Sequence, residues 1–190
     1  MSGNNNNSKM KVDYVIKRNG TKQEISFDKI LKRVKKLSEN LNVNPTRVTT
    51  EICSQIYPDV PTYQLDELGA QICASLATEH PDYAILAGNI TASNMQKNTC
   101  PSFTETMTKL YENKDMHGNK VNLISDETYK VICDHGPKLN TVIKYKRDFN
   151  LGFFSLKTLE KSYLFKINGK IVERPQDMFL RVAIGIHGDD

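Results

Sequence analysis

The sequence has no long apolar run and no apolar leader. Across its 190 residues no stretch approaches the ~20 consecutive apolar residues that cross a bilayer. The first residues, MSGNNNNSKMK, also lack the apolar segment of a secretory signal peptide. We therefore expect a soluble, cytoplasmic protein that has no membrane partner.

The cysteines and histidines are too scattered for a recognisable metal site. The four cysteines form no C-x-x-C pair, and a reducing compartment argues against disulfides. Cys53 and Cys73 adjoin the apolar stripes of predicted helices, which predicts buried free thiols, and we assign Cys100 and Cys133 structural roles. We predict no metal site. The histidines are equally dispersed, at His80, His117, His135 and His187.

Two glycine-rich phosphate motifs, GxxxxGK[ST] and GxGxxG, are also absent. A phosphate site in this chain would therefore use side-chain cations and helix amino ends. The formal net charge of +4 is a mild excess that suits anionic ligands. A nucleic-acid domain would show a dense basic stripe with interleaved aromatic residues. This sequence has no such stripe, so we expect no nucleic-acid partner.

Three segments of the chain differ in composition. The Asn-rich residues 1–13 are of low complexity, which predicts a disordered tail. Residues 14–104 show the pattern of a basic hairpin followed by four amphipathic helices, a unit of ordinary domain size. The pattern changes near Cys100-Pro101, so we expect residues 105–190 to form a second helical region.

The stretch YVIKRNGTKQEISFDK, residues 14–29, predicts a hairpin that leads directly into a helix. Asn19-Gly20 is a strong hairpin signal, because a type I′ turn needs positive φ at both central residues. Asn tolerates that conformation and Gly adopts it freely. The pattern predicts strands over residues 14–18 and 21–25.

Four helices are predicted after this hairpin. The first covers residues 27–37 and has Ser26 as its cap. Its basic residues are assigned to a solvated face, because the apolar residues occupy the other side; they are Lys32, Arg33, Lys35 and Lys36. The later helices begin at Asn44-Pro45, at Thr62 and at Pro81.

The second region is predicted to contain further helices and a second hairpin. One helix includes Phe103, and another begins after Ser125, where Asp126 and Glu127 favour a helix amino end. Asn168-Gly169 predicts the hairpin. The final stretch PQDMFLRVAIGI is apolar on nearly every side, so we expect that helix to be buried.

Three cations of the first hairpin can converge on one polyanion. Lys17 and Arg18 precede the turn, and Lys29 lies in the first turn of the following helix. Thr62 and Asp66 are one helical turn apart at another helix amino end. The alternative is a solvated hairpin tip, with Thr62 as a plain cap and Asp66 as an acid favoured by the helix dipole. In this alternative, Lys97 is a surface lysine at a helix end.

A resemblance favours the first interpretation. The stretches VIKRNGTKQEISFDKI, VPTYQLDELGAQICASLATEHPDYAILAGNI and LKTLEKSYLFKINGKIVERPQDMFLRVAIGIH resemble the amino-terminal part of the class I ribonucleotide reductase large subunit, of the eukaryotic and large-virus type. This resemblance implies a mainly α (α+β) fold. Residues 14–104 would be an ATP-cone, a four-helix bundle capped by a small β-sheet. Residues 105–190 would be the helical start of the reductase barrel domain.

The resemblance also implies a set of nucleotide-binding residues. Asp66 and Thr62 match positions near the base and sugar, and Lys29 matches a phosphate ligand. The turn departs from the family pattern at Asn19, where Asp is commoner, and we expect this change to affect turn stability and not binding. The implied ATP/dATP-binding residues are Lys17, Arg18, Gln23, Glu24, Ile25, Ser26, Phe27, Asp28, Lys29, Thr62, Asp66 and Lys97.

In the family that the chain resembles, the ATP-cone is an allosteric site where ATP activates the enzyme and dATP inhibits it. The implied ligands are ATP or dATP, with or without Mg²⁺. The implied partners are further large subunits in a homo-oligomer and the small radical-bearing subunit. Because ATP and dATP differ by one hydroxyl, we expect Asp66→Asn to change the preference between them more than the total affinity.

The resemblance implies no catalytic residue within this chain. The family's radical cysteine, redox cysteine pair, Asn and Glu lie in the barrel, and none of the four cysteines here has a matching context. We expect this chain alone not to reduce ribonucleotides. The alternatives are a diverged, stand-alone nucleotide-binding interaction protein and a nucleotide-responsive transcription regulator. The second would need a CxxC…CxxC zinc ribbon, which the sequence lacks.

Overall fold

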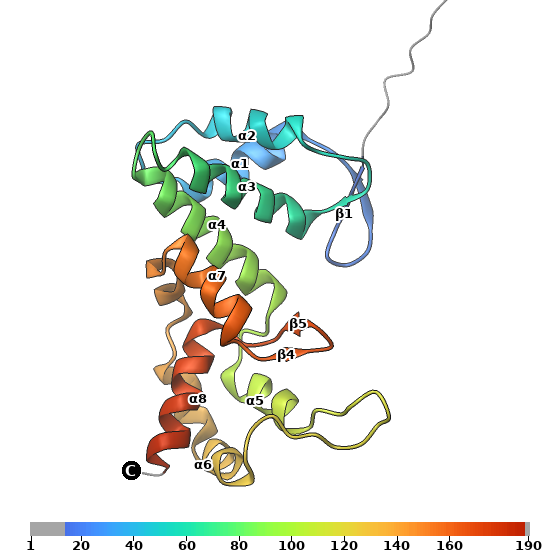
Figure 1. Ribbon diagram of the computed structural model, residues 1–190, viewed down its shortest axis with the longest axis vertical. Helices are drawn as coiled ribbons and strands as arrows, with labels where there is room; N and C mark the ends of the chain where they lie inside the picture. The colour runs from blue at the N-terminus through green and yellow to red at the C-terminus, as the bar shows by residue number, and fades with distance from the viewer. Residues whose placement is uncertain (1–13, 189–190) are drawn as a thin grey trace, which may run out of the picture.

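The structure is a computed structural model that describes residues 14–188 of the chain. It is mainly helical with small sheets, as Figure 1 shows. The helices are α1 (Phe27–Leu37), α2 (Pro45–Ser54), α3 (Thr62–Leu76), α4 (Asp82–Asn98), α5 (Phe103–Tyr111), α6 (Asp126–Val142), the 3₁₀ helix η1 (Tyr145–Asn150), α7 (Phe153–Ser162) and α8 (Pro175–His187). The strands are β1 (Tyr14–Ile16), β2 (Lys22–Glu24), β3 (Val60–Pro61), β4 (Lys166–Ile167) and β5 (Lys170–Ile171).

The predicted fold class is confirmed, because four helices and a small sheet form the first part of the chain and further helices follow. The tail predicted for residues 1–13 lies outside the described residues.

The first sheet brings two helix amino ends together. Its central strand β1 pairs antiparallel with β2, where Val15 lies opposite Gln23, and parallel with β3, where Val15 lies opposite Val60. Strand β2 leads into α1, and β3 leads directly into α3. The first turns of α1 and α3 therefore lie on the same side of the molecule, next to the hairpin.

The turn between β1 and β2 differs from the predicted type I′ turn. Gly20 has a φ of 80°, but Asn19 is not among the residues with positive φ. The Gly20 amide donates to the Lys17 carbonyl at 2.8 Å, and the Lys17 amide donates to the Thr21 carbonyl at 2.9 Å. Arg18 and Asn19 are thus the central residues of a turn that a glycine bulge follows. The side chain of Asn19 favours this form because its Oδ1 accepts from both the amide and the hydroxyl of Thr21.

The second hairpin has the predicted turn. Asn168 and Gly169 both have positive φ, 51° and 74°. They connect β4 and β5, in which Ile167 lies opposite Lys170. A two-residue loop with both central residues at positive φ is a type I′ turn, so this prediction is confirmed.

The predicted helix starts are also confirmed. The Ser26 hydroxyl accepts from the Lys29 amide at 3.4 Å, and α1 covers residues 27–37 as predicted. Asn44 Oδ1 accepts from the Arg47 amide at 3.1 Å at the start of α2. Ser125 caps α6 in the same way. Each cap satisfies an amide that has no partner within its helix.

Helix α4 belongs to the cores of both halves of the molecule. Its first half packs among α1, α2 and α3 through residues that include Leu86 and Ile90. Its second half packs against the later helices, where Ala92 and Met95 share a cluster with Leu156 of α7. Figure 1 shows α4 running from the upper unit down toward α7 and α8. The domain boundary at residue 104 stays a prediction, because α4 packs into the cores of both regions.

The close approach of α4 to α7 depends on Gly88. A Cβ atom there would lie 3.0 Å from the Leu151 carbonyl oxygen and 3.4 Å from the Phe153 amide nitrogen. Backbone atoms cannot move aside as a flexible side chain can. We expect Gly88→Ala to lower the free energy of unfolding by about 1–3 kcal/mol, measured by chemical denaturation.

The control is Gly185→Ala in α8, where the nearest atom outside that helix, Thr128 Oγ1, would lie 3.9 Å from the new Cβ. Alanine has the better helix propensity, so this variant should be as stable as the wild type or slightly more stable. Equal stability of the two alanine variants would contradict a close contact at Gly88.

The prediction that the last helix is buried holds for only one of its faces within the described residues. Met178 and Ile184 of α8 are buried, but Phe179, Val182 and Ile186 are 50%, 44% and 72% exposed. Only one face of α8 meets neighbouring helices within residues 14–188. The sequence pattern shows how apolar a helix is, but it cannot show which of its faces has a partner.

Of the two thiols predicted to be buried, Cys73 is buried and Cys53 is partly exposed. Burial raises the pKa of the Cys73 thiol to about 12. Cys100 is partly exposed and Cys133 is exposed. Within residues 14–188, no group of three or more His, Cys, Asp or Glu side chains is placed to hold a metal ion.

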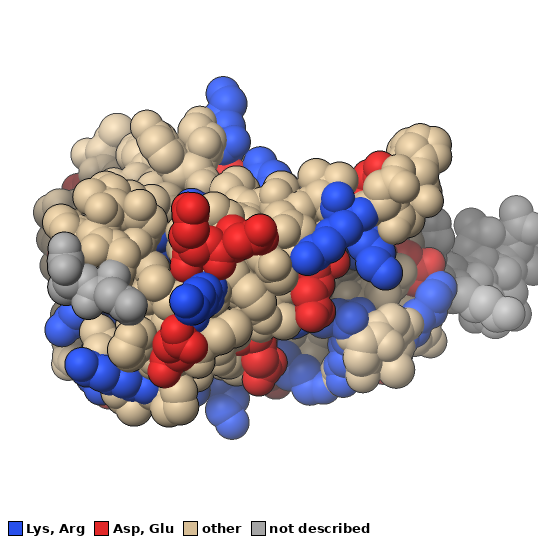
Figure 2. Space-filling view, turned by 90° about the horizontal axis from the view of Figure 1, so that it is seen from below, with Lys and Arg blue, Asp and Glu red and all other residues tan. Residues whose placement is uncertain are grey.

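No helix within the described part of the chain is both long and apolar enough to span a membrane. On the face of the molecule that Figure 2 shows, acidic and basic side chains are interspersed. Four cations, Arg18, Lys29, Arg33 and Lys97, line a pocket between the first hairpin and helices α1, α3 and α4.

Candidate functional site

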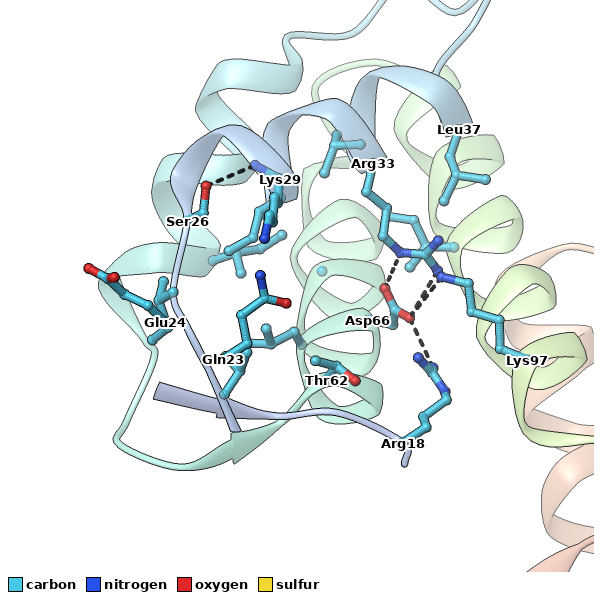
Figure 3. Close-up of a pocket in the computed structure, with 18 residues that line it drawn as sticks. Arg18, Gln23, Glu24, Ser26, Lys29, Arg33, Leu37, Thr62, Asp66 and Lys97 are labelled. Carbon is cyan, nitrogen blue, oxygen red and sulfur yellow. Dashed lines mark hydrogen bonds and ion pairs between the residues drawn. The ribbon is translucent and has the colours of Figure 1, made fainter. Parts of the chain in front are cut away.

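The pocket is a cavity of about 270 Å³ (Figure 3). Polar side chains from the hairpin, α1, α3 and α4 line one part of it, and apolar side chains line the interior. Its lining residues are Val15, Arg18, Gln23, Glu24, Ile25, Ser26, Lys29, Ile30, Arg33, Val34, Leu37, Ile52, Thr62, Leu65, Asp66, Gly69, Ile90 and Lys97.

The structure brings nine of the twelve sequence-predicted site residues to this one cavity: Arg18, Gln23, Glu24, Ile25, Ser26, Lys29, Thr62, Asp66 and Lys97. The other three, Lys17, Phe27 and Asp28, are exposed and do not line it. In Figure 3 the side chains of Gln23 and Lys29 point toward each other, whereas Glu24 points away from the other labelled residues.

Asp66 is the centre of the polar part. Its side chain is 8% exposed, and its carboxylate forms ion pairs with basic side chains from three different elements. Arg33 of α1 donates from Nε to Oδ1 at 2.5 Å and from Nη2 to Oδ2 at 2.9 Å. Arg18 of the hairpin turn donates to Oδ2 at 3.2 Å, and Lys97 Nζ of α4 lies 4.0 Å from the same oxygen. These contacts connect the hairpin, α1 and α4 through one residue of α3.

Two asparagines of α4 fix the direction of Arg18. Its Nη2 donates to Asn94 Oδ1 at 2.5 Å, and its Nε donates to Asn98 Oδ1 at 2.6 Å. Asn94 Nδ2 in turn donates to the Tyr63 carbonyl at 3.2 Å. The guanidinium is therefore held over the pocket although the hairpin turn itself is exposed.

Among the charged residues that line the pocket, Arg33 is the one that the sequence interpretation does not include in the site. It was assigned to the solvated face of the first helix, but its side chain is 28% exposed and pairs with Asp66. The signal was its spacing: Arg33 lies one turn after Lys29 and three residues after Ile30, and all three residues line the cavity. That spacing places Arg33 at the border between the apolar and polar faces.

Lys97 has a strongly perturbed ammonium group. Partial burial, followed by repulsion from Arg33, Arg18 and Lys36, outweighs the attraction of Asp66 and lowers the pKa of Lys97 to about 8. The group thus loses part of its charge near physiological pH while the site is empty.

We expect anion binding to depend on pH through this lysine. A bound phosphate raises the pKa of Lys97, so binding above pH 8 takes up a proton, and affinity falls as pH rises from about 8 to 9.5. The fall approaches tenfold per pH unit, measured by calorimetry in buffers of matched ionic strength. Lys97→Arg keeps its charge throughout this range and should remove the dependence. An unchanged pH profile in Lys97→Arg would exclude Lys97 as its source.

The carboxyl end of α4, which carries Lys97, is held by Arg174. Its guanidinium donates to the carbonyls of Gln96 and Thr99, at 2.8 Å and 3.1 Å, and to the Thr99 hydroxyl at 2.9 Å. It lies over the Tyr145 ring, 4.3 Å from the ring centroid. Arg174 is 5% exposed and thereby satisfies carbonyls that have no partner within the helix. The pocket is thus supported from the second region of the chain.

Comparison with known protein families gives two matches. Residues 13–98 match the model of the ATP cone domain. Residues 149–190 match the model described as "Ribonucleotide reductase, all-alpha domain". The first match contains the hairpin, α1–α4 and every residue that lines the pocket.

The chain is also similar to ribonucleoside-diphosphate reductase large subunits. It is 50% identical over 179 residues to that of Plasmodium falciparum (isolate Dd2), covering 93% of this chain and 22% of the relative. It is 49% identical over 193 residues to that of Dictyostelium discoideum, covering 98% and 22%. It is 49% identical over 181 residues to that of Caenorhabditis elegans, covering 93% and 23%. The chain thus spans less than a quarter of the length of these relatives, and the resemblance seen in the sequence is confirmed.

Proposed function

We propose that this chain, which joins an ATP-cone domain to the all-alpha domain of the ribonucleotide reductase large subunit, binds ATP and dATP in the pocket of Figure 3. Binding there regulates the activity of a ribonucleoside-diphosphate reductase. The observation that carries the proposal is the convergence of four cations on one small cavity.

Those cations are Arg18, Lys29, Arg33 and Lys97, and they come from the hairpin turn, α1 and α4. The buried carboxylate among them, Asp66, neutralises only part of their charge. A polyphosphate supplies the remaining negative charge through several charge-assisted hydrogen bonds. No glycine-rich loop is needed, because side chains from three elements replace it.

The apolar interior of the cavity suits a nucleobase. Ile30, Ile52, Leu65 and Ile90 line it, and the whole cavity has about 270 Å³. That volume lies just below the range of small-molecule sites, which run from about 300 to 1,000 Å³. We place the base against the apolar wall and the phosphates at the polar rim, where Lys29 and Lys97 are exposed.

The proposed roles follow from these positions. Lys29 and Lys97 bind phosphates, while Thr62 and Asp66 lie between rim and interior and hydrogen-bond the sugar or base. Lys17 of the hairpin and Phe27 and Asp28 of α1 lie outside the cavity, and they bind nucleotide only if the hairpin or the first turn of α1 moves. The cavity holds a single buried carboxylate, and that one is already engaged by arginines, so any Mg²⁺ is held by the phosphates themselves.

The proposed partners are further large subunits and the small radical-bearing subunit. ATP activates and dATP inhibits through the assembly of these subunits, with coupling of about 1–3 kcal/mol per site. In the alternative, a stand-alone nucleotide-binding interaction protein, nucleotide binds but no such assembly follows.

Calorimetry with the 190-residue chain tests the proposal. We expect ATP and dATP to bind at one site per chain and to compete with each other. Absence of binding by both nucleotides overturns the proposal. Light scattering after mixing with a full-length reductase large subunit separates the alternatives, because only the regulatory role predicts nucleotide-dependent co-assembly.

A further inference from the structure

Arg33 has a position in the pocket that its pairing with Asp66 does not fully explain. It lies one helical turn from Lys29 on the cavity side of α1, and it is also close to Lys97 of α4. Figure 3 shows its guanidinium between these two lysines, above Asp66. An arginine presents two parallel donors, a geometry that matches a phosphate as well as a carboxylate.

Asp66 and a phosphate would use the same donors. The carboxylate takes Nε and Nη2 of Arg33, and its Oδ2 is also shared with Arg18 and Lys97. A phosphate that enters between Lys29 and Lys97 meets an arginine whose Nε/Nη2 edge already binds Asp66, and a phosphate that takes this edge displaces the carboxylate. Binding is then an exchange of one anion for another.

We propose that Arg33 is a ligand for the phosphates of the bound nucleotide and that Asp66 competes with those phosphates for it. This inference rests on the proposed function, and it adds a binding residue to the site. In the empty site Asp66 keeps Arg33, Arg18 and Lys97 together despite their mutual repulsion. In the loaded site Arg33 turns to the phosphates, and the released carboxylate oxygens accept hydrogen bonds from the sugar.

The exchange predicts opposite effects of Asp66 on two ligands. Inorganic tripolyphosphate has no sugar or base that could hydrogen-bond to Asp66, so competition for Arg33 is the dominant effect of Asp66 on its binding. A nucleotide gains phosphate contacts when Asp66 is removed but loses the hydrogen bonds of its sugar. Asp66→Asn should therefore strengthen tripolyphosphate binding, while for ATP and dATP the two effects offset each other and the preference changes.

The test is calorimetric titration of the 190-residue chain and its variants with tripolyphosphate, without Mg²⁺ and at pH 7. We expect Asp66→Asn to bind about tenfold more tightly than the wild type and Arg33→Gln about tenfold more weakly. In the double variant the gain from Asp66→Asn should fall to under about threefold, because the freed donor pair is missing.

The matched control is Asp59→Asn, which removes one negative charge next to the same sheet. Asp59 pairs with Lys22 at 2.8 Å, is 46% exposed and does not line the pocket. We expect it to change tripolyphosphate affinity by less than about twofold, because exposed charges are screened. Far-UV circular dichroism before each titration confirms that the variants are folded.

Weaker, unchanged or absent tripolyphosphate binding by folded Asp66→Asn overturns the competition. Unfolding of that variant also overturns it, unless tripolyphosphate restores the fold. An affinity of Arg33→Gln equal to the wild type overturns the role of Arg33. If the wild type binds ATP but a variant gives one of these contradicting results, this inference fails and the proposed function stands. If the wild type binds neither ATP nor dATP, the proposed function fails instead.

Discussion

Replacing both pocket lysines, Lys29 and Lys97, by methionine should lower the affinity for ATP by more than about 100-fold. Each ammonium group that meets a phosphate at a partly shielded site contributes about 1.5–3 kcal/mol, which is roughly 10- to 150-fold in affinity. The two lysines approach the cavity from different elements, α1 and α4, so neither can take over the contact of the other. Calorimetry with ATP measures the change.

The matched control is Lys32→Met with Lys35→Met, which removes the same charge from the exposed face of α1. These side chains do not line the cavity, so the control should bind ATP within about threefold of the wild type. Equal losses in both double variants would mean that net charge, and not the pocket, determines nucleotide affinity. The lysine-to-methionine changes are not expected to unfold the chain, because Lys29 and Lys97 are both exposed at the rim.

Arg174→Met should lower the free energy of unfolding by about 3 kcal/mol. Arg174 is the donor for two carbonyls at the end of α4 and for the Thr99 hydroxyl, and it is 5% exposed. Methionine fills much of the same volume but leaves those acceptors without a donor in a place that water barely reaches. A buried polar group without a partner costs about 1–3 kcal/mol, and more than one is affected here.

Urea denaturation of Arg174→Met, with Arg147→Met as its control, measures this loss. Arg147 is an exposed arginine of η1, so its replacement should change stability by at most about 0.5 kcal/mol. Because the affected helix end carries Lys97, the folded Arg174→Met protein should also bind ATP more weakly. A stability equal to that of Arg147→Met would show that the end of α4 does not depend on Arg174.

The local features of the fold could be predicted from the sequence because each depends on a few neighbouring residues. Ser26 is predicted as a cap, and Asn44 and Ser125 are predicted to stand at helix starts; each of the three accepts a hydrogen bond from the third following amide. Asn168-Gly169 forms the expected type I′ turn. Asn19-Gly20 has the same turn signal but forms a different turn, because Asn19 bonds to Thr21. The dipeptide therefore predicts a hairpin more reliably than it predicts the turn type.

Features that depend on contacts between distant segments were predicted less well. Strand β3 was missed because two residues, Val60 and Pro61, give no periodic signal and are ordered by pairing with β1. Arg33 was placed in solvent because its partner, Asp66, lies 33 residues away in the sequence. Which face of α8 is buried cannot be predicted for the same kind of reason, since burial depends on which neighbours are present.

The candidate site itself was predicted mainly through the family resemblance. Spacing alone suggests that Arg18 and Lys29 can converge. It is equally consistent with Thr62 as a plain helix cap and Asp66 as an acid favoured by the helix dipole. The structure shows that Asp66 is instead the common partner of Arg18, Arg33 and Lys97. Whether nucleotide binds there stays a prediction that the titrations above address.

The most direct test of the central claim is a crystal structure of the 190-residue chain grown with millimolar ATP. The account predicts the triphosphate between Lys29, Arg33 and Lys97, with the base against the apolar wall that includes Ile52 and Ile90. It also predicts that Asp66 no longer holds both donors of Arg33. An empty pocket, or ATP bound at another surface of the chain, would contradict the account.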